Sequence, residues 1–235
     1  GVRAALWDIT TPEISVGLAR LPRQLDGYTI ALLTDVHIGP VLDARFLRQL
    51  VEQTNRMKPD AVALGGDIVD GRVMEIGQAV AELRHLRARD GVFYVTGNHE
   101  YYWGPDKWVD FIRSLGIRAL MNERVSLGDK SVSGAQFDLA GIPDHRAAQT
   151  HLVGPDVAIA TAGRDDQREL VMLAHQPIQI GQTSQVGTGL QLSGHTHGGQ
   201  LNPFGAFAAL QHQPYLAGLH RHEQTETQIY VSRGT

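Results

Sequence analysis

Short apolar runs that end in polar residues recur along the chain. Runs of this kind, bounded by glycine and polar residues, predict buried β-strands. The clearest runs cover residues 29–33, 61–64, 92–95, 170–173 and 190–192. Two further candidates cover residues 137–142 and 228–232, and residues 14–21 are expected to form an edge strand.

Apolar residues with helical spacing lie between the early strands. In residues 44–57 the side chains of Phe46, Leu47, Leu50 and Val51 share one face. The same spacing predicts a helix over residues 74–89 and a shorter one over residues 107–115. Alternating strands and helices predict an α/β fold. The chain beyond residue 120 is denser in glycine and predicted strand, so we expect this half to be richer in β-structure.

Polar side chains follow the apolar runs at the predicted strand ends. Ligands of open α/β sheets bind beyond the carboxyl ends of the strands, so these positions are candidates for a site. Taken alone, each motif is weak: Asp35-x-His37 is expected by chance or in a turn, and Asn98-His99 in a helix cap. His195-x-His197 is stronger, because alternate residues of an extended segment face the same side.

The full set of motifs points to metal binding. Five predicted strand ends supply the candidates. The first carries an Asp and a His, the second an Asp, the third an Asn and a His, the fourth a His, and the fifth two His. These are oxygen and nitrogen ligands for divalent metals, and several strand ends that converge can supply two ions. The candidate residues are Asp35, His37, Asp67, Asn98, His99, His175, His195 and His197.

At this point the sequence resembles a known family. The segments TDVH, GDIVD, GNHE, AHQP and GHTHGGQ, in this order, resemble the motifs of calcineurin-like metallophosphoesterases. The resemblance covers roughly residues 28–203. The GHTHGGQ form is most similar to a bacterial branch that includes membrane-tethered and exported members.

The resemblance implies a fold, an activity and a role for each motif residue. The implied fold is a two-sheet α/β sandwich flanked by helices, with a dinuclear metal site at the carboxyl ends of the strands. The implied activity is phosphoester hydrolysis by a hydroxide that bridges two divalent metals, either Mn, Fe or Zn. The implied ligands are Asp35, His37 and His197 for one metal, Asn98, His175 and His195 for the other, and Asp67 for both. His99 is expected to bind no metal and to protonate the leaving oxygen.

One departure from the family pattern narrows the expected activity. Protein phosphatases of this superfamily carry an Arg where this chain has Gly71. With His37 retained, this difference favours a phosphodiesterase, and a phosphomonoesterase is the alternative. Asp70 is expected to support the ligand loop by hydrogen bonding.

Two functions from other classes remain as rivals. A non-catalytic binding module on the same fold should show decayed ligands, whereas every expected ligand is present here. The His195-x-His197 pair also occurs in metallo-β-lactamase-like hydrolases, but these carry an Asp-His pair where Gly198-Gly199-Gln200 stands.

Several other residues admit both a functional and a structural interpretation. The aromatic run Tyr101-Tyr102-Trp103 could form a lip against the substrate, but helix packing is favoured. Asp144 and His145 could reach the site or form a simple turn. Phe204, Phe207 and Leu210 form an apolar patch that could touch lipid, but packing is favoured. His212, His220 and His222 are expected to be solvated.

Composition sets the outer limits. The 235 residues are 42% hydrophobic and 20% charged, which suits one globular domain spanning residues 1–235. The formal net charge of −4, without a basic stripe, predicts no nucleic-acid footprint. The partner that the resemblance implies is a small-molecule or lipid phosphoester. The absence of cysteine excludes disulfides, thiolate metal sites and cysteine nucleophiles.

The expected location is at a membrane or outside the cytoplasm. No apolar run reaches the ~18 residues of a membrane span. The chain begins with Gly1 rather than Met, and it resembles the tethered bacterial branch. We therefore expect a membrane-associated or exported protein with a tether outside this segment, and a cytoplasmic protein is the alternative.

Overall fold

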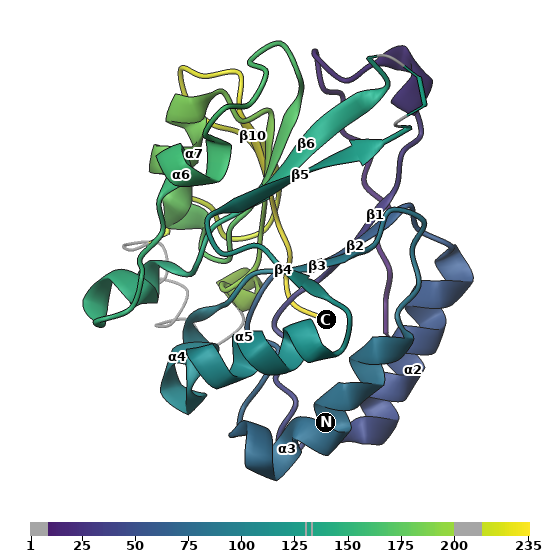
Figure 1. Ribbon diagram of the computed structural model, residues 1–235, viewed down its shortest axis with the longest axis vertical. Helices are drawn as coiled ribbons and strands as arrows, with labels where there is room; N and C mark the ends of the chain where they lie inside the picture. The colour runs from purple at the N-terminus through teal and green to yellow at the C-terminus, as the bar shows by residue number, and fades with distance from the viewer. Residues whose placement is uncertain (1–8, 130, 133, 200–212) are drawn as a thin grey trace.

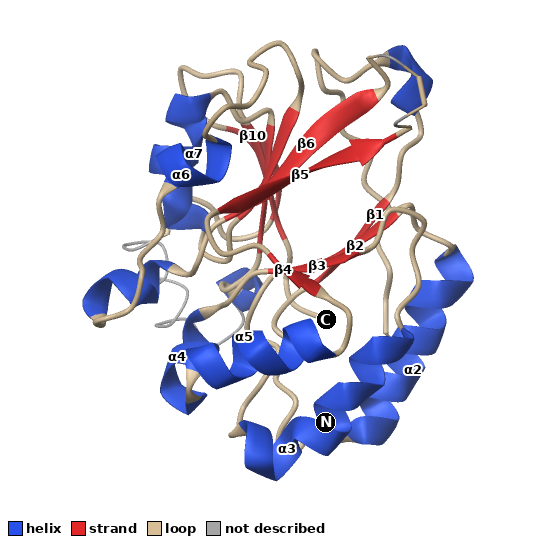
Figure 2. Cartoon of the chain, viewed as in Figure 1, coloured by secondary structure: helices blue, strands red, loops and turns tan. Residues whose placement is uncertain are grey.

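Two β-sheets pack face to face in the computed structural model, and helices cover their outer faces (Figure 1). The structure describes residues 9–129, 131–132, 134–199 and 213–235. Figure 2 shows the layers by element type, with the helices outside the two sheets. The predicted sandwich of two sheets flanked by helices is confirmed.

The first sheet is parallel throughout and comes from the first half of the chain. Its strands lie in the order β1 (Ile30–Leu33), β2 (Ala61–Leu64), β3 (Val92–Tyr94) and β4 (Arg118–Ala119). The connections run through α2 (Ala44–Met57), α3 (Val73–Val80), the 3-10 helix η2 (Ala81–His85), α4 (Asn98–Trp103) and α5 (Pro105–Ser114). Because every connection carries the chain back to the same edge, the carboxyl ends of these strands lie side by side.

The second sheet is mixed and comes from the second half. Its order is β5 (Glu123–Gly128), β6 (Gln136–Gly141), β7 (Leu170–Leu173), β8 (Leu190–Ser193), β10 (Gln228–Val231) and β9 (Gly218–Arg221). The four central strands are parallel, whereas β5 and β9 pair antiparallel at the two edges. The helices of this half are α6 (Val157–Thr161) and α7 (Ile180–Thr183), with short 3-10 turns η3 (His145–Gln149), η4 (Pro177–Gln179), η5 (Ser184–Val186) and η6 (His197–Gly199). The 3-10 turn η1 (Arg23–Leu25) precedes β1 in the first half.

Strand β2 shows why the central strands are continuous apolar runs. Val62 and Leu64 pack toward α2, α3 and α5, in the cluster between the first sheet and its helices. Ala61 and Ala63 pack toward the second sheet, in the cluster between the two sheets. A strand with both faces covered has no polar face, so its sequence lacks the alternation of a half-exposed strand.

Two sequence predictions need correction. The helix expected over residues 74–89 is α-helical only to Val80; a 3-10 turn follows, as is common at helix ends, and the Arg84 Nε donates to the Ala81 carbonyl at 2.8 Å. The edge strand expected over residues 14–21 is wrong. Side chains serve this segment's backbone in place of a strand ladder: Gln228 Nε2 donates to the Gly17 carbonyl, and the Arg20 amide donates to the Glu169 carboxylate.

Candidate metal centre

The candidate ligands come together where the two sheets meet at one edge. Asp35 and His37 follow β1, Asp67 follows β2, and Asn98 and His99 begin α4 just beyond β3. The second sheet contributes His175 after β7, and His195 and His197 after β8. A hydrogen bond joins the two sheets directly, because the His195 backbone amide donates to the Asp35 carboxylate at 3.0 Å. The convergence predicted from strand ends is therefore present.

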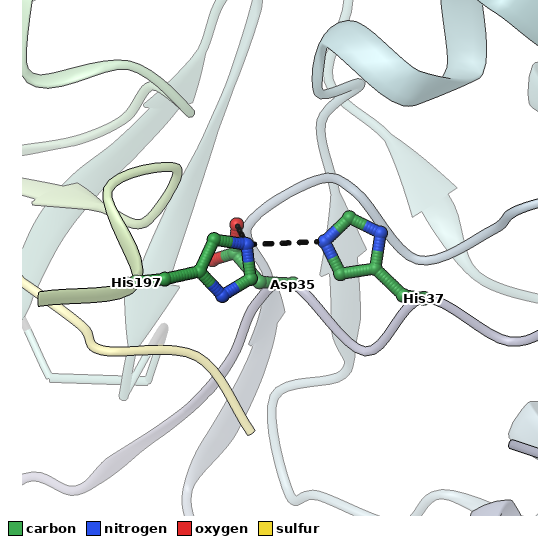
Figure 3. A group of neighbouring side chains, drawn as sticks. All are labelled: Asp35, His37 and His197. Carbon is green, nitrogen blue, oxygen red and sulfur yellow. Dashed lines mark hydrogen bonds and ion pairs between the residues drawn. The ribbon is translucent and has the colours of Figure 1, made fainter. Parts of the chain in front are cut away.

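One group of donors consists of Asp35, His37 and His197 (Figure 3). The Nε2 atoms of the two imidazoles lie 3.3 Å apart, and His197 Nε2 lies 3.6 Å from Asp35 Oδ1. Two neutral imidazoles that turn lone pairs toward each other at this distance repel one another. A shared proton or a nearby cation removes that repulsion, so the arrangement suits a positive ion.

A second group consists of Asp67, His175 and His195. His175 Nδ1 lies 2.7 Å from the Gly65 carbonyl, which accepts its proton. That bond directs the other ring nitrogen, Nε2, toward Asp67, whose Oδ2 lies 3.2 Å away. Metal-binding histidines are commonly fixed in this way by a carbonyl behind the ring.

Buried polar atoms without partners test whether the site fits a metal. Eight buried side-chain atoms of the described residues make no hydrogen bond, and among them His175 Nε2 and Asn98 Oδ1 lie at this site. Leaving such atoms unsatisfied costs ~1–3 kcal/mol each, so native proteins rarely tolerate them without a bound group. Both atoms belong to predicted ligands, and imidazole nitrogen and amide oxygen both coordinate divalent transition metals. The residues present therefore fit the implied metals.

The backbone at the ligands is held in an unusual conformation. Five of the seven predicted ligands have positive φ angles: Asp35 at 56°, His37 at 51°, Asp67 at 51°, His195 at 74° and His197 at 48°. Non-glycine residues in this region store on the order of 1–3 kcal/mol each, and such strain clusters at functional sites. The expectation that His195 and His197 face one side of an extended segment is wrong, because these tight turns direct them to different donor groups.

Two glycines let the backbones approach the carboxylates. A Cβ added at Gly97 would collide with Asp67 Oδ1 and with the Asp67 amide, and a Cβ at Gly194 would collide with Asp35 Oδ2. Only glycine fits at these two positions. The glycines flanking the ligands are therefore required by packing against charged side chains.

Burial and charge act in opposite directions on the pKa values of the second donor group. Burial works to raise the pKa of the Asp67 carboxyl, but the charge of His175, together with hydrogen bonds, holds it well below its ordinary value. Burial, helped by the neighbouring His175, lowers the pKa of His195 to about 3. His195 is therefore a neutral imidazole at physiological pH, which is the form that binds metal.

Asp70 contacts two histidines of the site. Its Oδ1 lies 2.5 Å from His99 Nδ1, and its Oδ2 lies 3.1 Å from His37 Nδ1 without a hydrogen bond. The supporting hydrogen bond expected of Asp70 is present, but sequence reasoning did not identify its partners. With Nδ1 held by Asp70, His99 turns Nε2 toward Asp67, whose Oδ2 lies 3.9 Å away.

Glu100 is a site residue to which sequence reasoning gave no role. Its side chain is fully buried, and its carboxylate accepts hydrogen bonds from the amides of Gly97 at 2.6 Å, Ile68 at 2.9 Å and Asp67 at 3.1 Å. It therefore ties the loop after β2 to the loop after β3. Burial, and then the nearby Asp67 charge, raises the pKa of Glu100 to about 7. The final Glu of GNHE, in the first turn of a helix, was the only sequence signal for it.

The aromatic run after GNHE divides between two roles. The Tyr101 hydroxyl bonds Thr96 Oγ1 at 3.2 Å, and Trp103 packs against the cluster beneath the first sheet. Tyr102 instead is 54% exposed, and its ring packs edge-on against His99, with 5.5 Å between ring centroids. Helix packing, the favoured interpretation, thus holds for two of the three residues.

The remaining candidates fall into three groups. Asp144 is buried, caps η3 and bonds Gln176, so it reaches the ligand loops rather than lying in a simple surface turn. His220 is exposed as expected, but lies in β9, and His222 bonds the Tyr215 hydroxyl. The residues outside the described part of the chain are Phe204, Phe207, Leu210 and His212.

Comparison with family models decides the family. Residues 28–199 match the model described as calcineurin-like phosphoesterase. The chain belongs to the calcineurin-like phosphoesterase family. Metal-dependent phosphoester hydrolysis is the chemistry of this family, and the donor cluster of the domain is consistent with it.

Similar proteins occur in bacteria and in animals. A metallophosphoesterase of Helicobacter pylori is 39% identical over 94% of this chain and 57% of its own length. A Bos taurus protein named as a transmembrane protein with a metallophosphoesterase domain is 36% identical over 97% of this chain and 52% of its own length. The chain thus spans little more than half the length of these relatives. Because they come from both bacteria and animals, membership of the bacterial branch stays a prediction.

Solved structures support the calcineurin-like fold. A dimetal phosphatase from Danio rerio superposes with a TM-score of 0.55 at 14% identity, covering 88% of this chain and 87% of that one. An NAD nucleotidase of Haemophilus influenzae gives a TM-score of 0.52 at 14% identity, covering 88% of this chain and 50% of that one. Within the part of this chain that is described, no helix has the length and apolar character to cross a bilayer.

The backbone strain at the predicted ligands predicts that glycine is more stable than alanine at position 197 of this calcineurin-like domain, the reverse of the usual order. His197→Gly and His197→Ala remove the same ring, but only glycine adopts φ 48° freely. In the metal-free protein, we expect His197→Gly to be more stable than His197→Ala by about 1 kcal/mol. Urea denaturation provides the measurement.

Exposed Glu52 in α2 is the matched control for this pair. There, glycine should be less stable than alanine by about 1 kcal/mol, because the position is helical. The same order at both positions would contradict the assignment of strain to His197.

Proposed function

We propose that this domain is a dinuclear metal-dependent phosphodiesterase. The observation that carries the proposal is the position of Asp67, which belongs to one donor group with His175 and His195 and to another with His37 and His99. A carboxylate between two groups of donors is suited to binding two ions at once.

The proposed ligand sets are those that the resemblance to the family implies. One ion is assigned to Asp35, His37 and His197, the other to Asn98, His175 and His195, and Asp67 is assigned to both. Mixed carboxylate, amide and imidazole donors suit Mn, Fe or Zn. Bound divalent cations would supply Lewis acidity toward the phosphoryl oxygens and would activate the nucleophilic water.

His99 is proposed as the proton donor to the leaving oxygen. Its Nδ1 is held by Asp70 at 2.5 Å, and its side chain is 33% exposed, so Nε2 can reach a substrate. Asp70 is a positioning residue in this scheme: its carboxylate holds the Nδ1 side of the ring and fixes which nitrogen faces the phosphate. The loop that carries Asp67 is held in place by Glu100 from behind.

The preference for diesters rests on the position of Gly71. Protein phosphatases place an Arg there, whereas here the Trp108 Nε1 donates to the Gly71 carbonyl at 3.0 Å and Ile76 packs beside it. The neighbouring Arg72 is exposed at the start of α3. A site without that cation has less to hold the doubly charged phosphate of a monoester. A phosphomonoesterase is the second candidate.

The proposed substrate is a small-molecule or lipid phosphoester, and the proposed location of the protein is at a membrane or outside the cytoplasm. Support comes from the relatives named as transmembrane proteins, of whose length the chain spans about half. Fractionation of the full-length protein in its host is the test. Recovery in the membrane or exported fraction is expected, and recovery only in the cytoplasm would contradict this location.

The preference for diesters predicts that wild-type protein loaded with Mn cleaves an alkyl nitrophenyl diester faster than nitrophenyl phosphate.

The proton-donor role predicts a leaving-group dependence. His99→Ala should lose ~10²–10⁴-fold in kcat on a dialkyl diester, because an alkoxide needs a proton to depart. The loss on the nitrophenyl diester should be smaller, because nitrophenolate leaves with little help.

Metal content of the same samples separates the alternatives. His99→Ala should retain the metals of the wild type, since His99 is not assigned as a ligand. Loss of metal would make His99 a ligand, and equal losses on both diesters would reduce its role to orienting the phosphate. Faster cleavage of the monoester by the wild type would favour the phosphomonoesterase.

A further inference from the structure

Beside His99, the wall of the candidate metal centre carries an aromatic ring, Tyr102, and a cation, Arg146. The ring of Tyr102 lies edge-on to His99, and the guanidinium of Arg146 lies 5.3 Å from the centroid of the Tyr102 ring. Tyr102 comes from α4 and Arg146 from η3, two elements that pack against each other. An ordered line thus runs from His99 through Tyr102 to Arg146.

The backbone of Arg146 is fixed to the loops that carry the ligands. Its amide donates to Asp144 Oδ1 at 2.6 Å, and the same oxygen accepts from Gln176 Nε2 at 3.0 Å. The Asp144 amide in turn donates to Thr96 Oγ1 at 3.2 Å. Gln176 follows the predicted ligand His175, and Thr96 lies in the loop between β3 and Asn98. The position of Arg146 is therefore coupled to the metal centre.

A second arginine in the chain shows what a structural arginine–tyrosine stack looks like. Arg89 lies 5.4 Å from the centroid of the Tyr28 ring, at the opposite, amino-terminal ends of the first-sheet strands. Two carboxylates neutralise it, Asp60 at 2.8 Å and Asp90 at 3.1 Å. Arg146 makes the same stack, but no ion pair with any residue in the described part of the chain.

From this contrast we propose that Tyr102 and Arg146 form a leaving-group subsite that selects phosphoesters whose leaving group carries a second anionic group. The proposal rests on the proposed function, in which His99 faces the leaving oxygen. A leaving group at His99 lies beside Tyr102, where a planar or apolar segment can contact the exposed ring. An anionic group further along meets the guanidinium, which can bind a carboxylate or a phosphate in bidentate fashion.

Two aryl esters that differ only in charge provide the test. The leaving groups are 4-carboxyphenol and 4-carbamoylphenol, which have nearly the same shape, and the esters are made in whichever form, mono- or diester, the wild type cleaves faster. The wild type should favour the carboxyphenyl ester by about tenfold or more in kcat/KM, mainly through KM. Calorimetric binding of the matching non-hydrolysable phosphonates should show the same preference.

Variants at position 146 separate charge from packing. Arg146→Gln should lose the preference and leave the carbamoylphenyl ester within about twofold of the wild type. Arg146→Lys keeps the charge and should retain part of the preference. Arg89→Ala, which breaks the matched stack far from the site, should retain all of it.

Three results would overturn the subsite. The first is equal use of both esters by the wild type. The second is an equal loss on both esters in Arg146→Gln, which would make the stack a packing contact only. The third is loss of the preference in Arg89→Ala. Failure of the metal-loaded wild type to cleave either ester would contradict the phosphoester hydrolase itself, and the subsite with it.

Discussion

The carboxylates of Asp35 and Asp67 hold the two sheets together at the edge where the site forms. Asp35 accepts the amide of His195 from the second sheet, and Asp67 lies 3.2 Å from the imidazole of His175. Elsewhere the sheets meet through apolar side chains that tolerate small shifts, whereas these polar contacts need defined geometry. The spacing of the ligands, and with it the chemistry, depends on these two side chains.

Strain and burial at this edge point to the same bound partner. Five predicted ligands lie in the left-handed backbone region, and at two others, Asn98 and His175, a buried polar atom lacks a hydrogen bond. Each feature is unfavourable by itself, and together they sum to several kcal/mol against folding. Divalent ions bound to these atoms would offset that cost, because binding to the folded state alone adds to stability. Hydrogen bonds between Glu100 and the loop that carries Asp67, and between Asp70 and His99, keep these side chains in place.

The sequence predicted the parts of the fold that are buried on both faces. Strands such as β2 are continuous apolar runs, and helix α2 has clear apolar spacing, so both were predicted at or near their observed bounds. The edge strand β5 was missed, because it is not a continuous apolar run: Arg124 and Ser126 alternate with the buried Val125 and Leu127. For residues 14–21 a strand was predicted that is not there. The apolar residues of this segment pack on the core, but its backbone bonds to side chains of distant residues.

The same division holds for the site. Strand ends located the predicted ligands, because parallel strands bring their carboxyl ends to one edge. The partners of Asp70 and the place of Glu100 could not be predicted, since they depend on how three tight turns orient side chains in space. The exposure of Tyr102 beside His99, and the approach of Arg146 from a segment 44 residues further along the chain, depend on tertiary packing alone.

Metal content per chain tests the central claim most directly. The wild-type protein, loaded with Mn or Zn and freed of excess ion, should hold two equivalents by elemental analysis. Asp67→Ala should lose more metal than Asp35→Ala, because Asp67 alone is assigned to both ions. A stoichiometry of one or less in the loaded wild type, or full metal content in Asp67→Ala, would contradict the account.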